Sequence, residues 1–160
     1  MDHINRFDSR NTLWLIRIEF GIGLVVALGL FAWHLGEVYW PTAVLLFVYI
    51  DAIGYIPGLI AHLRSPDGEV PRAYYVFYNT MHSFITQAAV MAVWIWLFGF
   101  GWALLAIPIH LCGDRSIFGN FMKPFDAPFE PKPIPAFVEF QRRLGERRTA
   151  RTRTLEESLS

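Results

Sequence analysis

The sequence predicts an all-α protein, a bundle of four transmembrane helices followed by a proline-rich and then basic tail. Three observations support this fold class. Hydrophobic residues make up 54% of the 160 residues, charged residues only 18%, and the mean hydropathy is +0.33. Long apolar stretches recur along the chain, and most charged residues lie outside residues 12–118. These features exclude an ordinary soluble domain, a disordered chain and a nucleic-acid-binding protein with a basic face.

Four stretches are long enough, or nearly so, to cross a bilayer, whose core of about 30 Å needs roughly 20 apolar helical residues. The predicted spans are residues 13–33, 41–63, 74–98 and 102–118, of which the last is short and ends in polar residues. The first is interpreted as a retained span and not a signal peptide, because Arg17 and Glu19 lie within it and no cleavage pattern follows. The expected divisions are therefore an N-terminus (1–12), a membrane domain (13–118) and a tail (119–160).

Basic residues near the ends of the spans predict the orientation. Arg6 and Arg10 precede the first span, and Arg64 and Arg72 lie between the second and third. More arginines follow the fourth span, whereas the loops at 36–40 and 99–101 contain no Lys or Arg. Because basic loops stay in the cytoplasm, we expect a multi-pass protein of the cell (inner) membrane with both termini cytoplasmic.

The tail divides into two parts of different composition. Residues 123–135 read KPFDAPFEPKPIP, and these prolines forbid a regular helix and favour an extended course, with neighbouring phenylalanines at the membrane interface. Residues 137–153 are rich in arginine. They form either an amphipathic helix on anionic lipid or a partly disordered basic tail that sets the topology.

Polar residues recur inside the predicted spans at helical spacing. An ionisable group in hydrocarbon costs roughly 2.5–3.5 kcal/mol on insertion scales, so each needs a partner or a function. One stripe of the second span joins Asp51 to His62, and a stripe of the third contains Asn79 and His82. His110 and Asp114 follow four residues apart on the fourth span, and Glu19 leads a stripe of small residues on the first. Four such stripes facing one another would form a polar pocket open toward the cytoplasm.

The first interpretation of this pocket is a metal site in a small membrane-embedded enzyme acting on a lipophilic substrate. Two imidazoles and two carboxylates suit a divalent ion such as zinc, iron or manganese, and the candidate ligands are Asp51, His82, His110 and Asp114. Glu19 or His62 would then move protons. Asn79 and Tyr78 would orient the substrate or a ligand histidine.

Two other interpretations remain open at this point. In one, the pocket binds no metal, and its carboxyl and imidazole groups transfer protons as in a cyclase or isomerase of lipophilic substrates. In the other, the polar groups only join the helices, and the protein is a non-catalytic subunit of a larger membrane complex. The expected partners are the lipid bilayer, a lipophilic small molecule, and a second copy or a larger complex, but no nucleic acid.

The order of these residues resembles a small uncharacterised bacterial family of four-helix membrane proteins. The resemblance covers about residues 51–123. It rests on Asp51 with Tyr55 and Gly58, on a YNxxH element at 78–82 and on an HxxxDRxxxG element at 110–119. It implies the architecture and the choice of residues, but no activity.

A more distant likeness is to bacterial membrane-bound metal-dependent hydrolases, which also present an aspartate, a histidine-serine element and a later histidine with a nearby aspartate. The comparable residues are Asp51, the pair His82-Ser83, and His110 with Asp114. The chain lacks the additional histidine that such proteins place before the histidine-serine element, and Asn79 lies near that position. The likeness implies metal-dependent hydrolysis.

Overall fold

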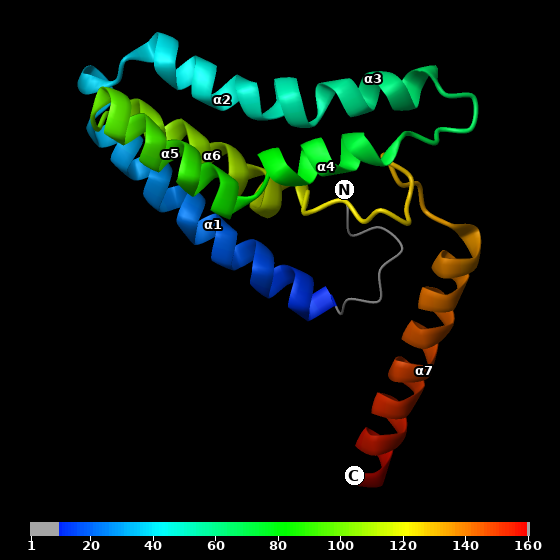
Figure 1. The fold of residues 1–160 in the computed structure, drawn as a ribbon. Helices are drawn as coiled ribbons and strands as arrows, with labels where there is room; N and C mark the ends of the chain where they lie inside the picture. The colour runs from blue at the N-terminus through cyan, green and yellow to red at the C-terminus, as the bar shows by residue number, and fades with distance from the viewer. Residues whose placement is uncertain (1–9, 160) are drawn as a thin grey trace.

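The computed structural model describes residues 10–159, and every regular element in that range is helical (Figure 1). The α-helices are α1 (Arg10–Trp33), α2 (Trp40–Gly54), α3 (Ile56–Arg64), α4 (Arg72–Met81), α5 (Phe84–Phe98), α6 (Ala106–Gly113) and α7 (Pro135–Leu159). Three short elements, η1 (Leu35–Glu37), η2 (Trp102–Leu105) and the π-helical η3 (Asp114–Phe118), flank them. The all-α class is therefore confirmed.

Two helices are long and apolar enough to cross a membrane, namely α1 and the nearly continuous α2–α3 helix over residues 40–64. A third candidate consists of α4 and α5 together, which bend by 57° at the break between them. The segment expected as a fourth span is helical, but it changes from 3₁₀ to α to π geometry within residues 102–118. Two or three candidate spans are thus present, and the fourth stays a prediction.

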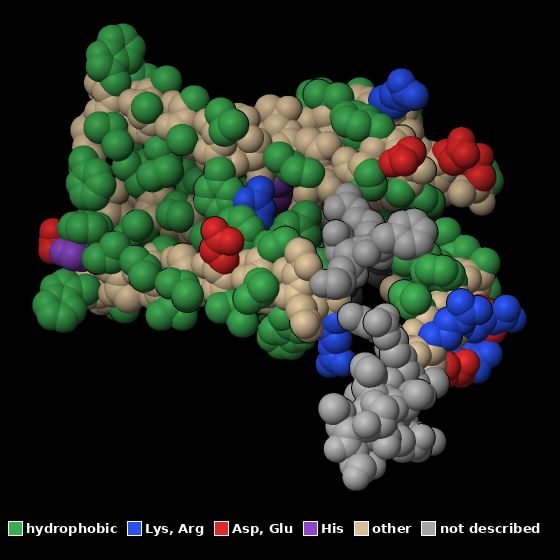
Figure 2. Space-filling view, turned by 90° about the horizontal axis from the view of Figure 1, so that it is seen from below, with side chains coloured by type: hydrophobic (Ala, Val, Ile, Leu, Met, Phe, Trp, Pro, Cys, Tyr) green, Lys and Arg blue, Asp and Glu red, His purple; other side chains and the backbone are tan. Residues whose placement is uncertain are grey.

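Helix α6 lies between α1 and α2, and α4 packs against α2 (Figure 1). The largest hydrophobic core forms where α2 meets α6 and η2, around Leu46, Ile50, Leu104 and Ile107. Figure 2 shows hydrophobic side chains covering the bundle on the face seen from below, while most charged side chains gather at the end near α7. This distribution fits helices that face lipid.

The bend between α4 and α5 differs from the straight helix expected over residues 74–98. A helix break leaves carbonyl groups without their usual partners, which is tolerated in an apolar setting only where other donors replace them. Here Gln87 Nε2 donates to Met81 O at 2.7 Å, and Arg115 Nη2 donates to His82 O at 3.0 Å. The hydroxyl of Tyr49 in turn donates to the side-chain oxygen of Gln87, which is 1% exposed. Side chains of α5 itself, of η3 and of α2 therefore stabilise the break.

Residues 119–134 contain no regular helix, as the prolines predict, but they pack against α3 and α4 as a strap. Phe129 is fully buried against Tyr75 and Tyr78, so its ring contacts other side chains of the protein. A Cβ on Gly58 would lie 2.3 Å from the Phe129 ring, so only glycine allows this approach. The strap is further held by Tyr75, whose hydroxyl donates to Ala127 O at 2.8 Å.

Candidate metal centre

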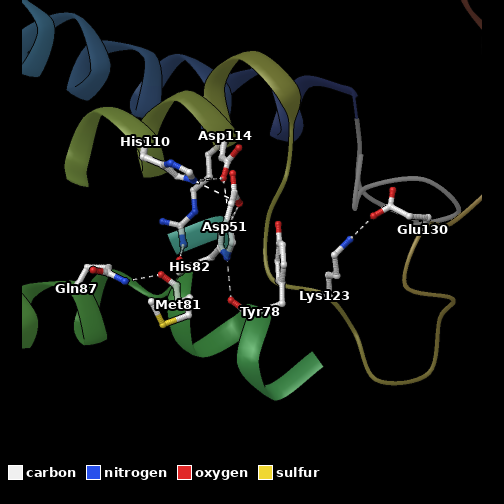
Figure 3. A network of polar contacts seen from close by, with 10 residues as sticks. Asp51, Tyr78, Met81, His82, Gln87, His110, Asp114, Lys123 and Glu130 are labelled. Carbon is white, nitrogen blue, oxygen red and sulfur yellow. Dashed lines mark hydrogen bonds and ion pairs between the residues drawn. The ribbon is translucent and has the colours of Figure 1, made fainter. Parts of the chain in front are cut away.

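Two histidines and two aspartates meet at the centre of the molecule (Figure 3). His82 Nε2 lies 3.3 Å from both Asp51 Oδ1 and Asp114 Oδ2. His110 Nε2 lies 3.7 Å from the same Asp51 oxygen and 3.4 Å from the same Asp114 oxygen. Each imidazole therefore faces both carboxylates. Within the described part of the chain, the structure brings together all four residues expected as metal ligands.

Four separate elements supply these side chains. Asp51 lies one turn before the junction of α2 and α3, and His82 lies at the break between α4 and α5. His110 and Asp114 come from successive turns of α6 and η3, which their spacing of four places on one face. The bend between α4 and α5 thus places the His82 imidazole next to Asp51 and Asp114.

The orientation of the His82 ring is set by a local hydrogen bond. Its Nδ1 lies 3.0 Å from the carbonyl oxygen of Tyr78, one turn earlier, and the two rings stack at 4.0 Å. Because a carbonyl only accepts, Nδ1 carries a hydrogen, and in the neutral ring the lone pair is on Nε2. His82 Nε2 faces both carboxylates at 3.3 Å, which fits either a second ring hydrogen that it donates to them or a cation held between them. A backbone carbonyl on the far ring nitrogen is also the usual support of a metal-ligating histidine.

The imidazole of His110 is less completely hydrogen-bonded than that of His82. Its two ring nitrogens are buried and are the only such side-chain N/O atoms, among residues the structure describes, with no hydrogen-bond partner. A buried polar group left unsatisfied costs about 1–3 kcal/mol. The Phe47 ring packs edge-on against His110 at 4.8 Å. His110 Nε2 nevertheless lies 3.4 Å from Asp114 Oδ2, so either a ring proton shared with that carboxylate or a bound cation would satisfy it.

The separations match those of metal ligands. Ligand bonds of about 2.0–2.2 Å in a tetrahedral site place the ligand atoms roughly 3.3–3.6 Å from one another. The four imidazole–carboxylate distances run from 3.3 to 3.7 Å. Ligand atoms of Asp51, His82 and His110 also lie within 4.8 Å of one another. Two carboxylates with neutral imidazoles carry a charge of −2, which a divalent cation balances.

A cavity of about 340 Å³ opens from this centre toward the strap. The residues around it are Asp51, Tyr55, Tyr78, His82, Asp114, Phe118, Asn120, Lys123 and Glu130. At its far end Lys123, only 5% exposed, donates from Nζ to Phe129 O at 2.6 Å and pairs with Glu130 at 3.3 Å. The ammonium also lies over the Tyr78 ring, 4.8 Å from its centre. Sequence reasoning missed Lys123 and Glu130, because an irregular segment carries no periodicity that could link them to the helices.

The remaining predicted site residues lie in different places. Tyr78 lines the cavity and orients His82. Asn79 instead holds the strap, since its amide donates to Lys123 O at 2.9 Å and accepts from Lys123 N at 2.7 Å. His62 binds the carbonyl of Gly68 at 2.7 Å in the α3–α4 loop, and Glu19 is exposed on α1. The structure places neither Glu19 nor His62 among the residues that line the cavity.

Two arginines position η3, which carries Asp114. Arg17 of α1 donates to the carbonyl oxygens of Ser116 and Ile117 at 2.7 and 2.6 Å. Arg115 lies over the rings of Phe20 and Phe84, 4.8 and 4.4 Å from their centres, while it also donates to the His82 carbonyl. The guanidinium groups therefore join α1, η3 and the bend into one support for the centre.

Comparisons of the chain with protein-family models, with curated proteins and with solved structures gave no match. What the structure establishes is a helical protein with two or three candidate membrane spans and a buried group, Asp51, His82 and His110, that could hold a metal ion.

Proposed function

We propose that the protein is a small membrane-embedded enzyme that uses a divalent metal ion to act on a lipophilic substrate. One observation carries the proposal. Ligand atoms of Asp51, His82 and His110, which come from three separate elements, lie within 4.8 Å of one another between helices whose other surfaces are apolar. Groups that are costly to bury in such a setting are retained where they have a function.

In this proposal Asp51, His82 and His110 hold the ion, which leaves a fourth position for water or substrate. A divalent ion there would polarise a carbonyl or phosphoryl oxygen and activate a water molecule for hydrolysis. The chain's own residues supply the rest. Asp114, whose side chain is 17% exposed, faces the cavity and can accept a proton. Tyr55 and Tyr78 form the cavity wall, and Lys123 presents a positive charge at the far end.

The proposed setting is the cytoplasmic half of the membrane domain. The arginines at residues 6, 10, 64 and 72 and those of the tail support it, because basic segments stay on the cytoplasmic side. The cavity opens toward the strap, which follows the predicted fourth span and so belongs to that side. A substrate would then enter from the inner leaflet or the cytoplasm.

The test is elemental analysis of the detergent-purified protein. Wild type is compared with His110→Ala, which removes one proposed ligand. The control is His34→Ala, which removes a histidine that directly follows α1 and lies outside the metal centre. We expect near-stoichiometric zinc, iron or manganese in wild type and in His34→Ala, and loss of the metal in His110→Ala. Well-folded wild type that takes up no metal after resupply would overturn the proposal and leave the metal-free proton-transfer pocket or the subunit as the interpretation.

A further inference from the structure

An apolar groove lies next to the metal centre, and helices α2 and α6 contribute residues to both. Its volume is about 250 Å³, and its lining is entirely apolar. Leu28 and Phe31 of α1 form one wall, α2 between Trp40 and Val48 forms the other, and Ala106 with Ile109 of α6 forms the floor.

The groove ends where the metal centre begins. Along α2, the last groove residue Val48 and the metal-centre residue Asp51 are three positions apart, a rise of about 4.5 Å. Along α6, Ile109 of the groove directly precedes His110. Phe47 belongs to the groove and packs against the His110 ring at 4.8 Å. The Asp51 side chain is 41% exposed, and it lines the cavity that opens toward the strap.

We propose that the groove binds the hydrocarbon chain of a single-chain amphiphile whose oxyanion head lies at the metal centre. This inference rests on the proposed function and names its substrate class. The groove is a single hollow formed by α1, α2 and α6, which suits one chain. A divalent ion at the metal centre would favour an anionic head with several oxygen acceptors, such as a phosphate monoester.

The two parts of the site have different physical roles. In a membrane, lipid tails are as apolar as the groove, so the chain gains little from leaving the lipid. The head must therefore supply most of the affinity through the metal, and the groove aligns the chain. This dependence separates a specific ligand from ordinary surrounding lipid, which would fill the groove whether or not a metal is present.

The experiment uses the full chain in nanodiscs and a dodecyl phosphate probe with a photoreactive diazirine near the end of its chain. Cross-links are mapped by mass spectrometry, and metal content is measured in the same samples. We expect saturable labelling of α2 within residues 40–48 and of α6 at Ala106–Ile109. Removal of the metal should abolish it, and a neutral dodecyl probe without the phosphate should not label saturably.

Two variants test the groove itself. Val44→Trp fills it and should reduce labelling about tenfold, because a bulky side chain excludes the chain by overpacking. Val93→Trp on α5 is the matched control, since Val93 and Val44 are similarly exposed, at 54% and 57%. Labelling that persists in Val44→Trp, in metal-depleted protein or with the neutral probe would overturn this inference while the bound metal still supports the proposed function. Absence of metal from wild type would overturn both.

Discussion

His34 and His82 make the same local hydrogen bond in two regions with different surroundings. In each, Nδ1 lies 3.0 Å from the backbone carbonyl oxygen four residues earlier. His34 lies at the exposed end of α1 and stacks on Trp102 at 3.4 Å, whereas His82 is buried and directs Nε2 at two carboxylates. The comparison shows that the helix sets the orientation of a histidine ring, but other elements decide whether the second ring nitrogen belongs to a site.

The largest expected effect is the loss of metal-dependent stability in His82→Ala. A ligand that binds only the folded state at a thousandfold excess over its Kd adds about 4 kcal/mol. We therefore expect added metal to raise the Tm of wild type and of His34→Ala, and to leave His82→Ala unchanged. Thermal unfolding in detergent, with and without a chelator, measures this. An equal metal response in His82→Ala would remove the distinction between the two histidines.

Phe129→Ala should destabilise the strap by about 3 kcal/mol, because it removes a fully buried aromatic ring and leaves a cavity. Phe125→Ala is the control, since Phe125 lies in the same segment but is 52% exposed. Limited proteolysis within residues 119–134 should become faster only in Phe129→Ala. Equal cleavage rates in the two variants would mean that Phe129 does not hold the strap.

Gly54→Ala tests how closely α2 must approach the bend. A Cβ there would lie 2.8 Å from Met81 Cβ and 3.3 Å from two atoms of the His82 ring. We expect a cost of about 1–3 kcal/mol and weaker metal binding, because the added methyl overpacks the junction and displaces the ring. Gly29→Ala on α1 meets nothing within 4 Å and should be neutral. Metal titration of both variants decides whether the close approach matters.

The smallest effect is expected in α7, where charged groups pair at the surface. Arg142 forms ion pairs with Glu139 and Glu146. The hydrogen bonds that the Arg142 and Arg143 guanidiniums donate to Glu139 hold the pKa of this carboxyl below its ordinary value. The ion pair therefore persists above that lowered pKa and is lost as the pH falls through it. Because these groups are exposed, Arg142→Ala should leave the Tm unchanged between pH 5 and 8. A clear drop in Tm would show that α7 packs on the bundle or on a second copy.

Residues 10–118 show which features of the structure helical periodicity can predict. The apolar runs predict the all-helical class, and the spacing of His110 and Asp114 predicts that they share a face. Regular spacing also singled out Asp51 and His82, because a costly polar group in an apolar helix stands out without any structural knowledge. The same reasoning assigned Glu19 to the pocket, but the structure leaves it exposed on α1. Periodicity identifies a face and does not say what that face meets.

The sequence by itself determined the class of elements and the chemistry available to them, because composition and period act within one segment. Only the tertiary structure decided that α4 and α5 bend by 57° at His82, since Arg115, which donates to the His82 carbonyl at the break, comes from η3. It also decided that the strap buries Phe129 and places Lys123 opposite the two aspartates. An irregular segment has no period, so its position depends on long-range packing and on the hydrogen bonds that Asn79 and Tyr75 make to its backbone.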